Sequence, residues 1–182
     1  DSLTPEFRVI AMDQRGHGFS GHTPGHYLRE DHARDIEFIL RNVCEEPSIV
    51  WGHSMGGGNA IETMGRAPEM FGALIIEDSS VRPPGVGVPG NRPVALKFRK
   101  HLELLEAGLS FEQMKERLAD MSPGQGEYYP AWKAEGLMQM DIEIIQNALS
   151  GAPRGGSNPA EILQKVDVPF LYLQADPAVG GT

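Results

Sequence analysis

Short apolar runs that alternate with helical patterns are the feature that most limits what this sequence can fold into. The runs lie at residues 7–12, 48–51, 72–76 and 168–173, and each is followed by a turn that contains glycine or acidic residues. Continuous apolar runs of this length are typical of strands that are buried on both faces of a parallel sheet. Helical patterns lie between them, for example at 31–43, so the sequence predicts an α/β fold with a mostly parallel sheet and covering helices.

The character of the sequence changes at Val81. Proline and glycine dominate residues 82–90, which predicts a linker. Helical patterns then follow one another without an intervening strand: one around 94–105, one opened by a capping box of Ser110 and Gln113, a single helix over 132–149 ended by Gly151, and an N-cap at Asn158 before Pro159. We therefore predict a core formed by residues 1–80 and 159–182, with a helical insertion over 81–158.

Composition excludes several classes of protein. The chain of 182 residues has 16 basic and 25 acidic side chains, a formal charge of −9, so nucleic acid and anionic membranes are not expected partners. No apolar run approaches the ~18 residues of a membrane span. Cys44 is the single cysteine, and no His, Asp and Glu cluster has metal-ligand spacing, so we expect neither a metal nor another cofactor. No signal peptide is visible, which makes the cytoplasm the default expectation, and the oligomeric state is left open.

The motif GHSMG at residues 52–56 carries the chemistry. It matches G-x-S-x-G, and it follows a predicted strand and precedes a predicted helix. In that context Ser54 lies on a sharp, strained turn, and small residues two positions before and after it let the chain segments pass closely. The backbone N–H of Met55 then points to where an oxyanion forms. The pattern predicts a nucleophilic serine with an oxyanion donor beside it.

A phosphate-binding loop is the other interpretation of a glycine-rich helix start. A Walker A loop requires Lys followed by Ser or Thr after its last glycine, whereas Gly58 is followed by Asn59. The dinucleotide pattern G-x-G-x-x-G is also absent from this segment of the sequence. The nucleophile interpretation is therefore favoured.

Two motifs together resemble the α/β-hydrolase family. The segment DQRGHGFS at 13–20 is similar to the D-x-R-G-x-G-x-S turn of that family, and GHSMGG at 52–57 is similar to its nucleophile elbow. The helical insertion resembles the family's cap domain, and the segment VDVPFL at 166–171 resembles the strand that returns to the sheet. The resemblance implies an α/β-hydrolase fold with a helical cap that is incomplete at both ends.

The resemblance also implies a triad in the order Ser, acid, His. No histidine follows His101 in the sequence, so the implied base lies beyond residue 182. A structural role is expected for all six histidines, with His101 at the surface or an interface of the cap. These histidines are His17, His22, His26, His32, His53 and His101.

Two aspartates remain candidates for the triad acid. Asp176 follows the returning strand, but Ala178 stands where the family usually has the acid. Asp78 follows the strand after the nucleophile helix, where some family members place it. We favour Asp78 slightly, and either carboxylate would orient the histidine. Asp13 and Arg15 are expected to hold neighbouring loops together rather than to take part in catalysis.

The resulting hypothesis is a serine hydrolase that acts on a small, fairly apolar, ester-like substrate through an acyl-enzyme on Ser54. Carbon–carbon and lactone hydrolysis use the same site and stay open. The alternative is a non-catalytic ligand-binding protein of the same fold, or an inactive fragment. Without its base, the 182-residue chain itself is expected to have little or no activity.

Overall fold

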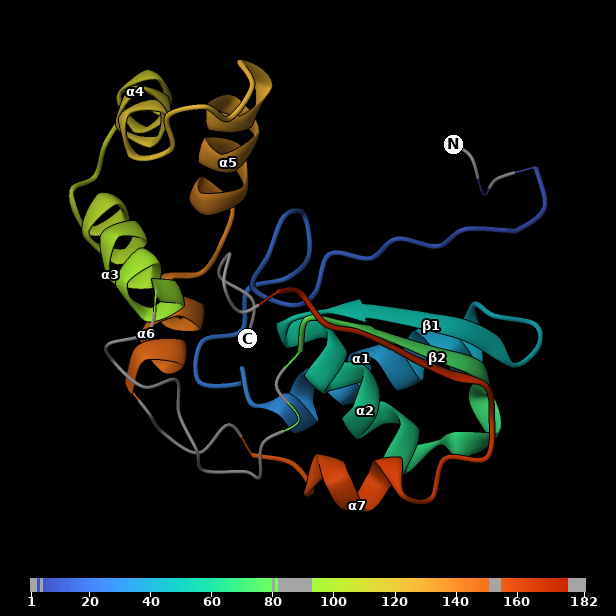
Figure 1. The fold of residues 1–182 in the computed structure, drawn as a ribbon. Helices are drawn as coiled ribbons and strands as arrows, with labels where there is room; N and C mark the ends of the chain where they lie inside the picture. The colour runs from blue at the N-terminus through green and yellow to red at the C-terminus, as the bar shows by residue number, and fades with distance from the viewer. Residues whose placement is uncertain (1–2, 4, 80, 82–92, 151–154, 177–182) are drawn as a thin grey trace.

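A computed structural model describes most of the chain, and its centre is a parallel sheet of three strands. The described residues are 3, 5–79, 81, 93–150 and 155–176. The strands are β1 (Ser48–His53), β2 (Phe71–Glu77) and β3 (Phe170–Leu173), in the order β1-β2-β3 (Figure 1). Both pairs of neighbours are parallel, as predicted, so the carboxyl ends of all three strands lie at one edge of the sheet.

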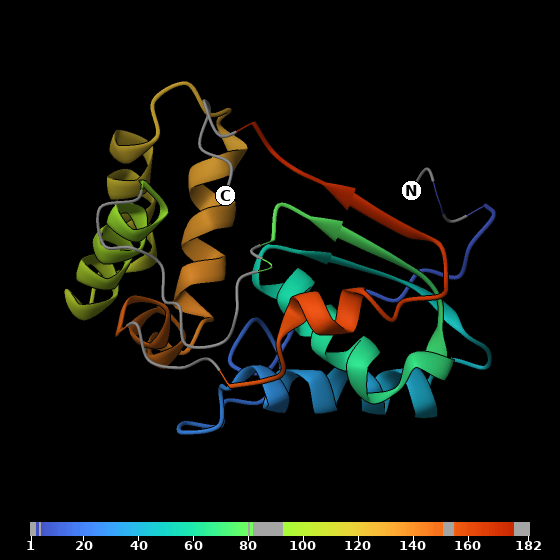
Figure 2. The same ribbon diagram turned by 60° about the horizontal axis from the view of Figure 1, so that its bottom comes forward.

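Helices cover one face of this sheet. They are α1 (Arg29–Asn42), α2 (Met55–Arg66) and the short α7 (Pro159–Leu163), and all three lie on the same side in Figure 2. Helix α2 contacts both the sheet and the other two helices. Its apolar side packs against α1 and the inner residues of β2. The core between the sheet and these helices is formed by Leu40, Ala60, Ile61, Met64, Phe71, Leu74 and Ile76.

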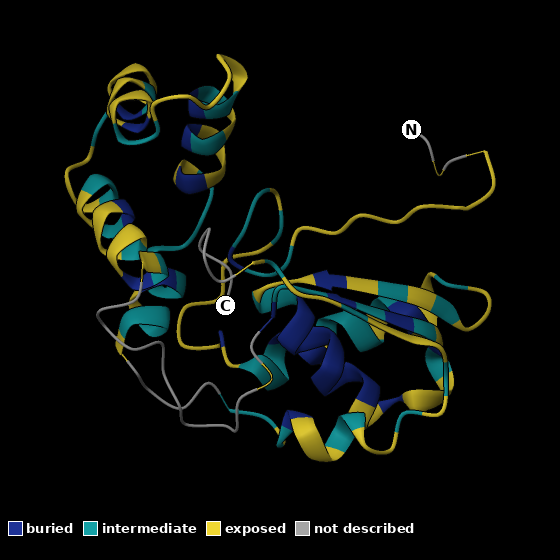
Figure 3. Ribbon diagram, viewed as in Figure 1, coloured by how far each residue is buried: buried dark blue, intermediate teal, exposed yellow. Residues whose placement is uncertain are grey.

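The opposite face of the sheet is open within the described part of the chain. Trp51 is 58% exposed and lies in register with Ile75 of β2, which in turn is paired with the exposed Leu171 of β3. Exposed positions along the strands are visible in Figure 3. The expectation of burial on both faces is therefore wrong for these residues: the apolar runs suit two covered faces, but the described helices cover one.

Residues 7–12 do not form the expected strand. Among the described residues this segment has no ladder partner, and the side chains of Phe7, Val9 and Ile10 are exposed. An apolar, β-branched sequence becomes a strand only when another strand pairs with its backbone groups. The segment runs as an extended chain toward the loop that starts at Asp13 (Figure 1).

A second group of helices lies beyond the carboxyl edge of the sheet (Figure 1). It comprises α3 (Pro93–Glu106), α4 (Phe111–Met121), α5 (Tyr128–Met138) and α6 (Ile142–Ser150). The group has its own core, formed by Met114, Leu118, Ala134, Leu137 and Ile145. The predicted capping box is confirmed, because Ser110 accepts from the backbone N–H of Gln113 and the side chain of Gln113 accepts in return.

The division of the chain into a core of 1–80 and 159–182 and an insertion of 81–158 stays a prediction. The expected linker at 82–90 and Gly151 lie outside the described residues. The expected N-cap is confirmed, since the side chain of Asn158 accepts from Ala160 N at 3.2 Å.

The single helix expected over 132–149 is divided into α5 and α6 at Asp141. The side chain of Asp141 accepts from the backbone N–H of Glu143 at 3.0 Å and from the Tyr27 hydroxyl at 2.7 Å, while its own N–H donates to Gly16 O at 2.8 Å. The hydrogen bond from Tyr27 holds the pKa of Asp141 below its usual value. The break therefore joins the helical group to the loop of the core, a contact that periodicity cannot predict.

Candidate active site

Ser54 occupies the turn between β1 and α2 with backbone angles that side-chain-bearing residues rarely adopt. Its φ is 50° and its ψ is −114°, and its side chain is exposed. Its N–H donates to Glu77 O at 2.9 Å, so the end of β2 holds the turn in place. Positive φ costs about 1–3 kcal/mol for a residue with a Cβ, and such strain is concentrated at functional sites. The predicted strand–turn–helix context of the motif is confirmed.

Steric crowding explains why glycine stands at residues 52 and 57. A Cβ placed on Gly52 would lie 2.5 Å from the carbonyl oxygen of Gly56, and one placed on Gly57 would lie 2.7 Å from Cβ of Ser79. Backbone atoms cannot rotate away from such a contact. The close passage that the sequence predicted for residues 52 and 56 is therefore present.

The first turn of α2 presents free donors next to Ser54. The N–H groups of Gly57 and Gly58 donate to Ser54 O at 3.1 and 3.3 Å. In the part of the chain that is described, the N–H groups of Met55 and Gly56 have no hydrogen-bond partner. The first N–H groups of a helix lie at the positive end of its dipole, which favours negative charge there. Met55 thus offers the kind of donor that an oxyanion needs.

Both candidate acids lie at the carboxyl edge of the sheet, after adjacent strands. Asp78 directly follows β2, has a φ of 41°, and donates its N–H to Leu173 O at 2.7 Å. It is the next residue after Glu77, whose carbonyl holds Ser54. Asp176 lies three residues after the end of β3 and is exposed. The backbone contacts thus place Asp78 one residue from the group that holds the serine turn.

The Asp78 side chain also lies near Tyr172. Burial, and then the charge of Asp78, raise the pKa of Tyr172 above its ordinary value. The Tyr172 hydroxyl donates to Ser79 O at 2.7 Å and so ties β3 to the segment after β2.

The loop over 13–21 forms a scaffold, as predicted. Arg15 donates from Nε and Nη2 to the two carboxylate oxygens of Asp35, at 2.6 and 2.7 Å, which fixes the loop to α1. These hydrogen bonds raise the pKa of Arg15. Asp13 accepts from Phe19 N at 3.1 Å and closes the tight turn at Gly18, where φ is +51°.

Sequence reasoning missed a polar pair that joins α2 to the loop over 13–21. Asn59 on α2 is 2% exposed, and its Nδ2 donates to Gln14 Oε1 at 2.6 Å. This bond orients the Gln14 amide so that its nitrogen lies 3.2 Å from where a Cβ of Gly56 would be. An asparagine among the apolar residues of the helical pattern was the available signal, because buried amides need partners.

Two histidines are buried, His32 on α1 and His101 on α3. His32 stacks on Tyr27, and its Nδ1 has no partner in the described structure. His101 on α3 is 3% exposed, so the expectation of a surface position is wrong, although α3 does contact α5. Burial, the largest cause in each case, lowers the pKa of both imidazoles to about 4.

Because these two histidines are buried, we expect the free energy of unfolding to decrease as the pH is lowered. Between pH 6.5 and about 4 the unfolded chain binds protons that the folded chain does not, so the free energy of unfolding decreases as the pH falls. Each group contributes about 1.4 kcal/mol per pH unit in that window. Urea unfolding of His32→Asn and His101→Asn at several pH values is expected to show a shallower slope for each variant. A slope equal to that of the unchanged protein would contradict the assignment.

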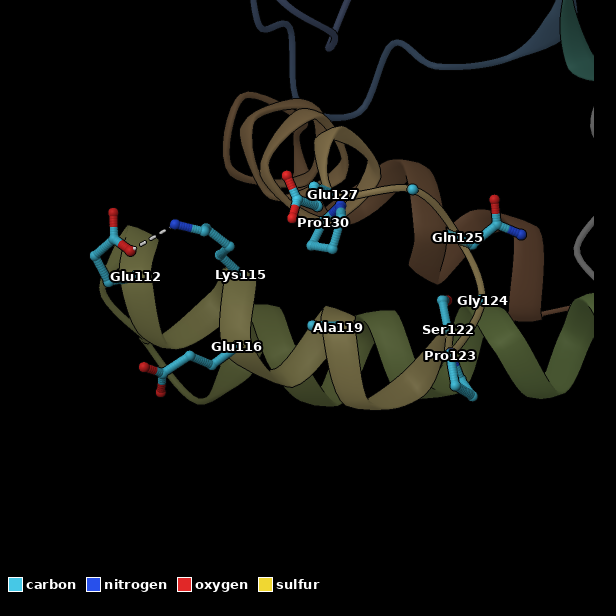
Figure 4. Close-up of a pocket in the computed structure, with 11 residues that line it drawn as sticks. Glu112, Lys115, Glu116, Ala119, Ser122, Pro123, Gly124, Gln125, Glu127 and Pro130 are labelled. Atoms are coloured by element: carbon cyan, nitrogen blue, oxygen red, sulfur yellow. Dashed lines mark hydrogen bonds and ion pairs between the residues drawn. The ribbon is translucent and has the colours of Figure 1, made fainter.

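A cavity of about 390 Å³ opens between α4 and the start of α5 (Figure 4). Its lining combines apolar and small residues with three glutamates, Glu112, Glu116 and Glu127, and with Lys115, which is paired with Glu112 at 3.0 Å. None of its lining residues belongs to the serine turn or to the sheet. This cavity is therefore separate from the candidate site.

Within the described ranges, no group of three or more His, Cys, Asp or Glu side chains is arranged to hold a metal ion. Over the same residues, no helix is both long and apolar enough to span a bilayer.

Comparison with known families agrees with this fold. Residues 1–139 match the family model described as the alpha/beta hydrolase fold. The match covers most of the chain, and the chain therefore belongs to the α/β-hydrolase fold family.

Among its curated relatives is 2-(acetamidomethylene)succinate hydrolase of Mesorhizobium japonicum, which is 33% identical over 76 residues, 42% of this chain and 27% of the relative. Monoacylglycerol lipase of Mycolicibacterium smegmatis is 29% identical over 136 residues, 71% of this chain and 46% of the relative. The chain thus spans less than half the length of these two relatives.

The fold is similar to that of solved structures. The N-formylmaleamic acid deformylase from Pseudomonas putida S16 superposes with a TM-score of 0.73 at 22% identity, over 94% of this chain and 64% of that one. At this identity the likeness shows the fold alone.

Proposed function

We propose that this chain carries the nucleophile of a serine hydrolase that acts on a small, fairly apolar, ester-like substrate. The observation that carries the proposal is Ser54, held at a φ of 50° between β1 and the N-terminus of α2. A strained, exposed serine in this position is the form in which the α/β-hydrolase fold presents its nucleophile. Relatives named as a hydrolase and a lipase support the class of reaction.

In the proposed mechanism, Ser54 Oγ attacks the substrate carbonyl and its proton passes to a histidine base. The acyl group is then bound to Oγ, and the protonated histidine donates to the leaving alcohol. Water, activated by the same histidine, releases the acid and restores the serine. The proposal takes the order Ser, acid, His of the family and so places the base after residue 182.

The backbone N–H of Met55 would donate a hydrogen bond to the carbonyl oxygen and stabilise the negative charge that forms there. Two features support this role: this donor has no other partner within the described residues, and it lies at the positive end of α2. The adjacent N–H of Gly56 adds to the same field.

Asp78 is the proposed triad acid, with Asp176 as the alternative. The position of Asp78, one residue after the carbonyl that accepts from Ser54 N, supports this choice. Loss of the triad carboxylate lowers kcat by about 10⁴-fold, because the histidine loses its orientation and its stabilised charged form. We therefore expect Asp78→Asn to produce that loss, and Asp176→Asn to lower kcat by less than about tenfold.

The experiment compares steady-state hydrolysis of a short-chain 4-nitrophenyl ester by the two variants, in a polypeptide that extends far enough to include the histidine. The reverse pattern would assign the acid to Asp176. If both substitutions lower kcat equally and only slightly, the proposal that one of these carboxylates is the triad acid would be contradicted. The 182-residue chain serves as a further control, and it is expected to hydrolyse the ester no faster than the Ser54→Ala variant.

A further inference from the structure

A short segment at the break between α5 and α6 joins the helical group to the core. Of the hydrogen bonds between two described residues, those that connect helices α3 to α6 with the core begin or end within residues 139–143. Their partners on the core are Gly16, His22, Gly25 and Tyr27. We refer to residues 139–143 and these four partners as the junction.

Asp141 is the centre of the junction. Its backbone N–H donates to Gly16 O at 2.8 Å, and one carboxylate oxygen accepts from the Tyr27 hydroxyl at 2.7 Å. The other carboxylate oxygen accepts from Glu143 N at 3.0 Å. The side chain is 12% exposed. A largely buried polar group whose partners are all in place specifies one arrangement of the segments around it.

Tyr27 is a fixed donor on the core side. It is 7% exposed, its ring stacks on His32, and its hydroxyl oxygen also accepts from Thr23 N at 2.7 Å. Burial, and then the hydrogen bond to Asp141, raise the pKa of Tyr27 above its ordinary value. The phenol therefore keeps its proton and stays a donor to the carboxylate.

Two further contacts lie on either side of Asp141. Glu143 accepts from Gly25 N at 2.8 Å, and Nε2 of His22 lies 3.2 Å from the carbonyl oxygen of Gln139. The junction thus contacts the core before, at and after Asp141. Contacts at three places hinder rotation of the helical group about any one of them.

The loop that carries Gly16 also contacts α2 beside the serine turn. In this loop, Gln14 accepts from Nδ2 of Asn59 at 2.6 Å, and Nε2 of Gln14 lies 3.2 Å from where a Cβ of Gly56 would be. Direct contacts therefore run from Asp141 through the loop to the start of α2. Figures 1 and 2 show that the helical group lies beyond the carboxyl edge of the sheet, at which the serine turn is located.

We propose that the junction holds the helical group at one position relative to the serine turn, and that Asp141 is a positioning residue for the substrate. Asp141 acts through Gly16 and Tyr27 and does not touch the reacting atoms. A substrate group that extends from the reacting carbonyl to the helical group then meets its contacts in one place, and a displacement of ~1 Å can lower a rate about 10²-fold. The part of the inference that concerns the substrate rests on the proposed function.

The first test measures position and needs no turnover. Spin labels are attached to the 182-residue chain at Glu46→Cys in the core and at Arg117→Cys on α4, with Cys44→Ala removing the native thiol. Both labelled positions are exposed. Pulsed electron paramagnetic resonance gives the distribution of distances between the labels. We expect a narrow distribution with the junction intact, and one about twofold wider or more in Asp141→Ala.

The second test separates positioning from loss of stability. Values of kcat and KM are measured for 4-nitrophenyl acetate and 4-nitrophenyl octanoate with the polypeptide that includes the histidine base. Asp141→Ala is expected to lower kcat/KM about 10-fold or more for the octanoate and less than about twofold for the acetate, because the acetyl group extends least from the carbonyl. Unfolding of a fraction of the molecules would lower both values equally.

Further variants show which contact acts. Asp141→Asn keeps the size and one oxygen acceptor and is expected to restore part of the octanoate activity. Tyr27→Phe removes the donor, and its combination with Asp141→Ala should add little to Asp141→Ala alone, because both changes remove the same bond. Asp120→Ala is the matched control: Asp120 is an exposed acid on α4, and both readouts should stay unchanged. Circular dichroism melting checks that each variant is folded.

An unchanged distance distribution in Asp141→Ala would overturn the inference. A wider distribution with equal losses on the two esters would also overturn it, because the junction would then support the fold without positioning the substrate. The same effects in Asp120→Ala would assign them to charge alone, with the same consequence. If the unchanged polypeptide hydrolyses neither ester, the proposed function fails and the substrate role with it, whereas the distances still decide whether the junction holds the helical group.

Discussion

Ser54→Ala is expected to lower kcat/KM for a short-chain ester by about 10⁴- to 10⁶-fold in the polypeptide that includes the histidine base. Removal of Oγ eliminates the acyl-enzyme, and the remaining oxyanion donor and binding contacts supply only a small residual acceleration. The loss should be in kcat with little change in KM, because Oγ contributes to the transition state more than to binding. Steady-state kinetics with a 4-nitrophenyl ester give both parameters.

Ser48→Ala provides the matched control. Ser48 begins β1, six residues before Ser54 on the same strand-to-turn segment, and its hydroxyl donates to the backbone oxygen of Glu46 at 3.1 Å. Its removal is expected to leave kcat/KM within about twofold and to cost at most about 1 kcal/mol of stability. Turnover retained in Ser54→Ala would exclude Ser54 as the nucleophile.

Gly52→Ala is expected to destabilise the protein by about 3 kcal/mol, although it adds only one methyl group. That methyl would lie 2.5 Å from Gly56 O and 2.7 Å from Gly57 N, and these backbone atoms are fixed by the start of α2. Relief requires the turn to move, which is the costly form of overpacking. The shift of the turn is also expected to reduce hydrolysis, because the direction of Ser54 depends on it.

Gly136→Ala is the control for a glycine that has room. Gly136 lies inside α5, and a Cβ there meets nothing within 4 Å. Alanine has the higher helix propensity, so this substitution is expected to stabilise the protein by about 0.5–1 kcal/mol. Urea unfolding of both variants measures the difference. Equal stabilities for Gly52→Ala and Gly136→Ala would show that the close passage at the serine turn is not real.

The parts of the fold that the sequence predicted are those with local signals. The strand, turn and helix around Ser54 carry their signals within a few residues: an apolar run, a glycine motif and a helical repeat. The segment 7–12 has an equally apolar run but no ladder partner among the described residues, and pairing is not a local property. The helix expected over 132–149 keeps its apolar repeat through Asp141, where a hydrogen bond from the distant Tyr27 marks the break.

In the candidate site, too, the features with local sequence signals could be predicted and those that depend on distant contacts could not. Ser54 and Met55 were identified from the motif, because the motif and its chemistry occupy consecutive residues. The contact between Gln14 and Asn59 joins positions 45 residues apart, and no spacing rule indicates it. For His101 the sequence left the surface and an interface of the cap open, because whether that side of the helix faces water depends on how α3 packs. The choice between Asp78 and Asp176 likewise depends on geometry at the sheet edge, and it stays a proposal.

Labelling with a serine-directed fluorophosphonate tests the central claim most directly. The reagent forms a bond between phosphorus and the attacking oxygen as fluoride leaves, so it marks the nucleophile itself. In the polypeptide that includes the histidine base, we expect one adduct per molecule, located by tandem mass spectrometry on the peptide that contains Ser54, and no adduct in Ser54→Ala. An adduct on another serine, or ester hydrolysis that continues with Ser54 unlabelled and the reagent in excess, would contradict the account.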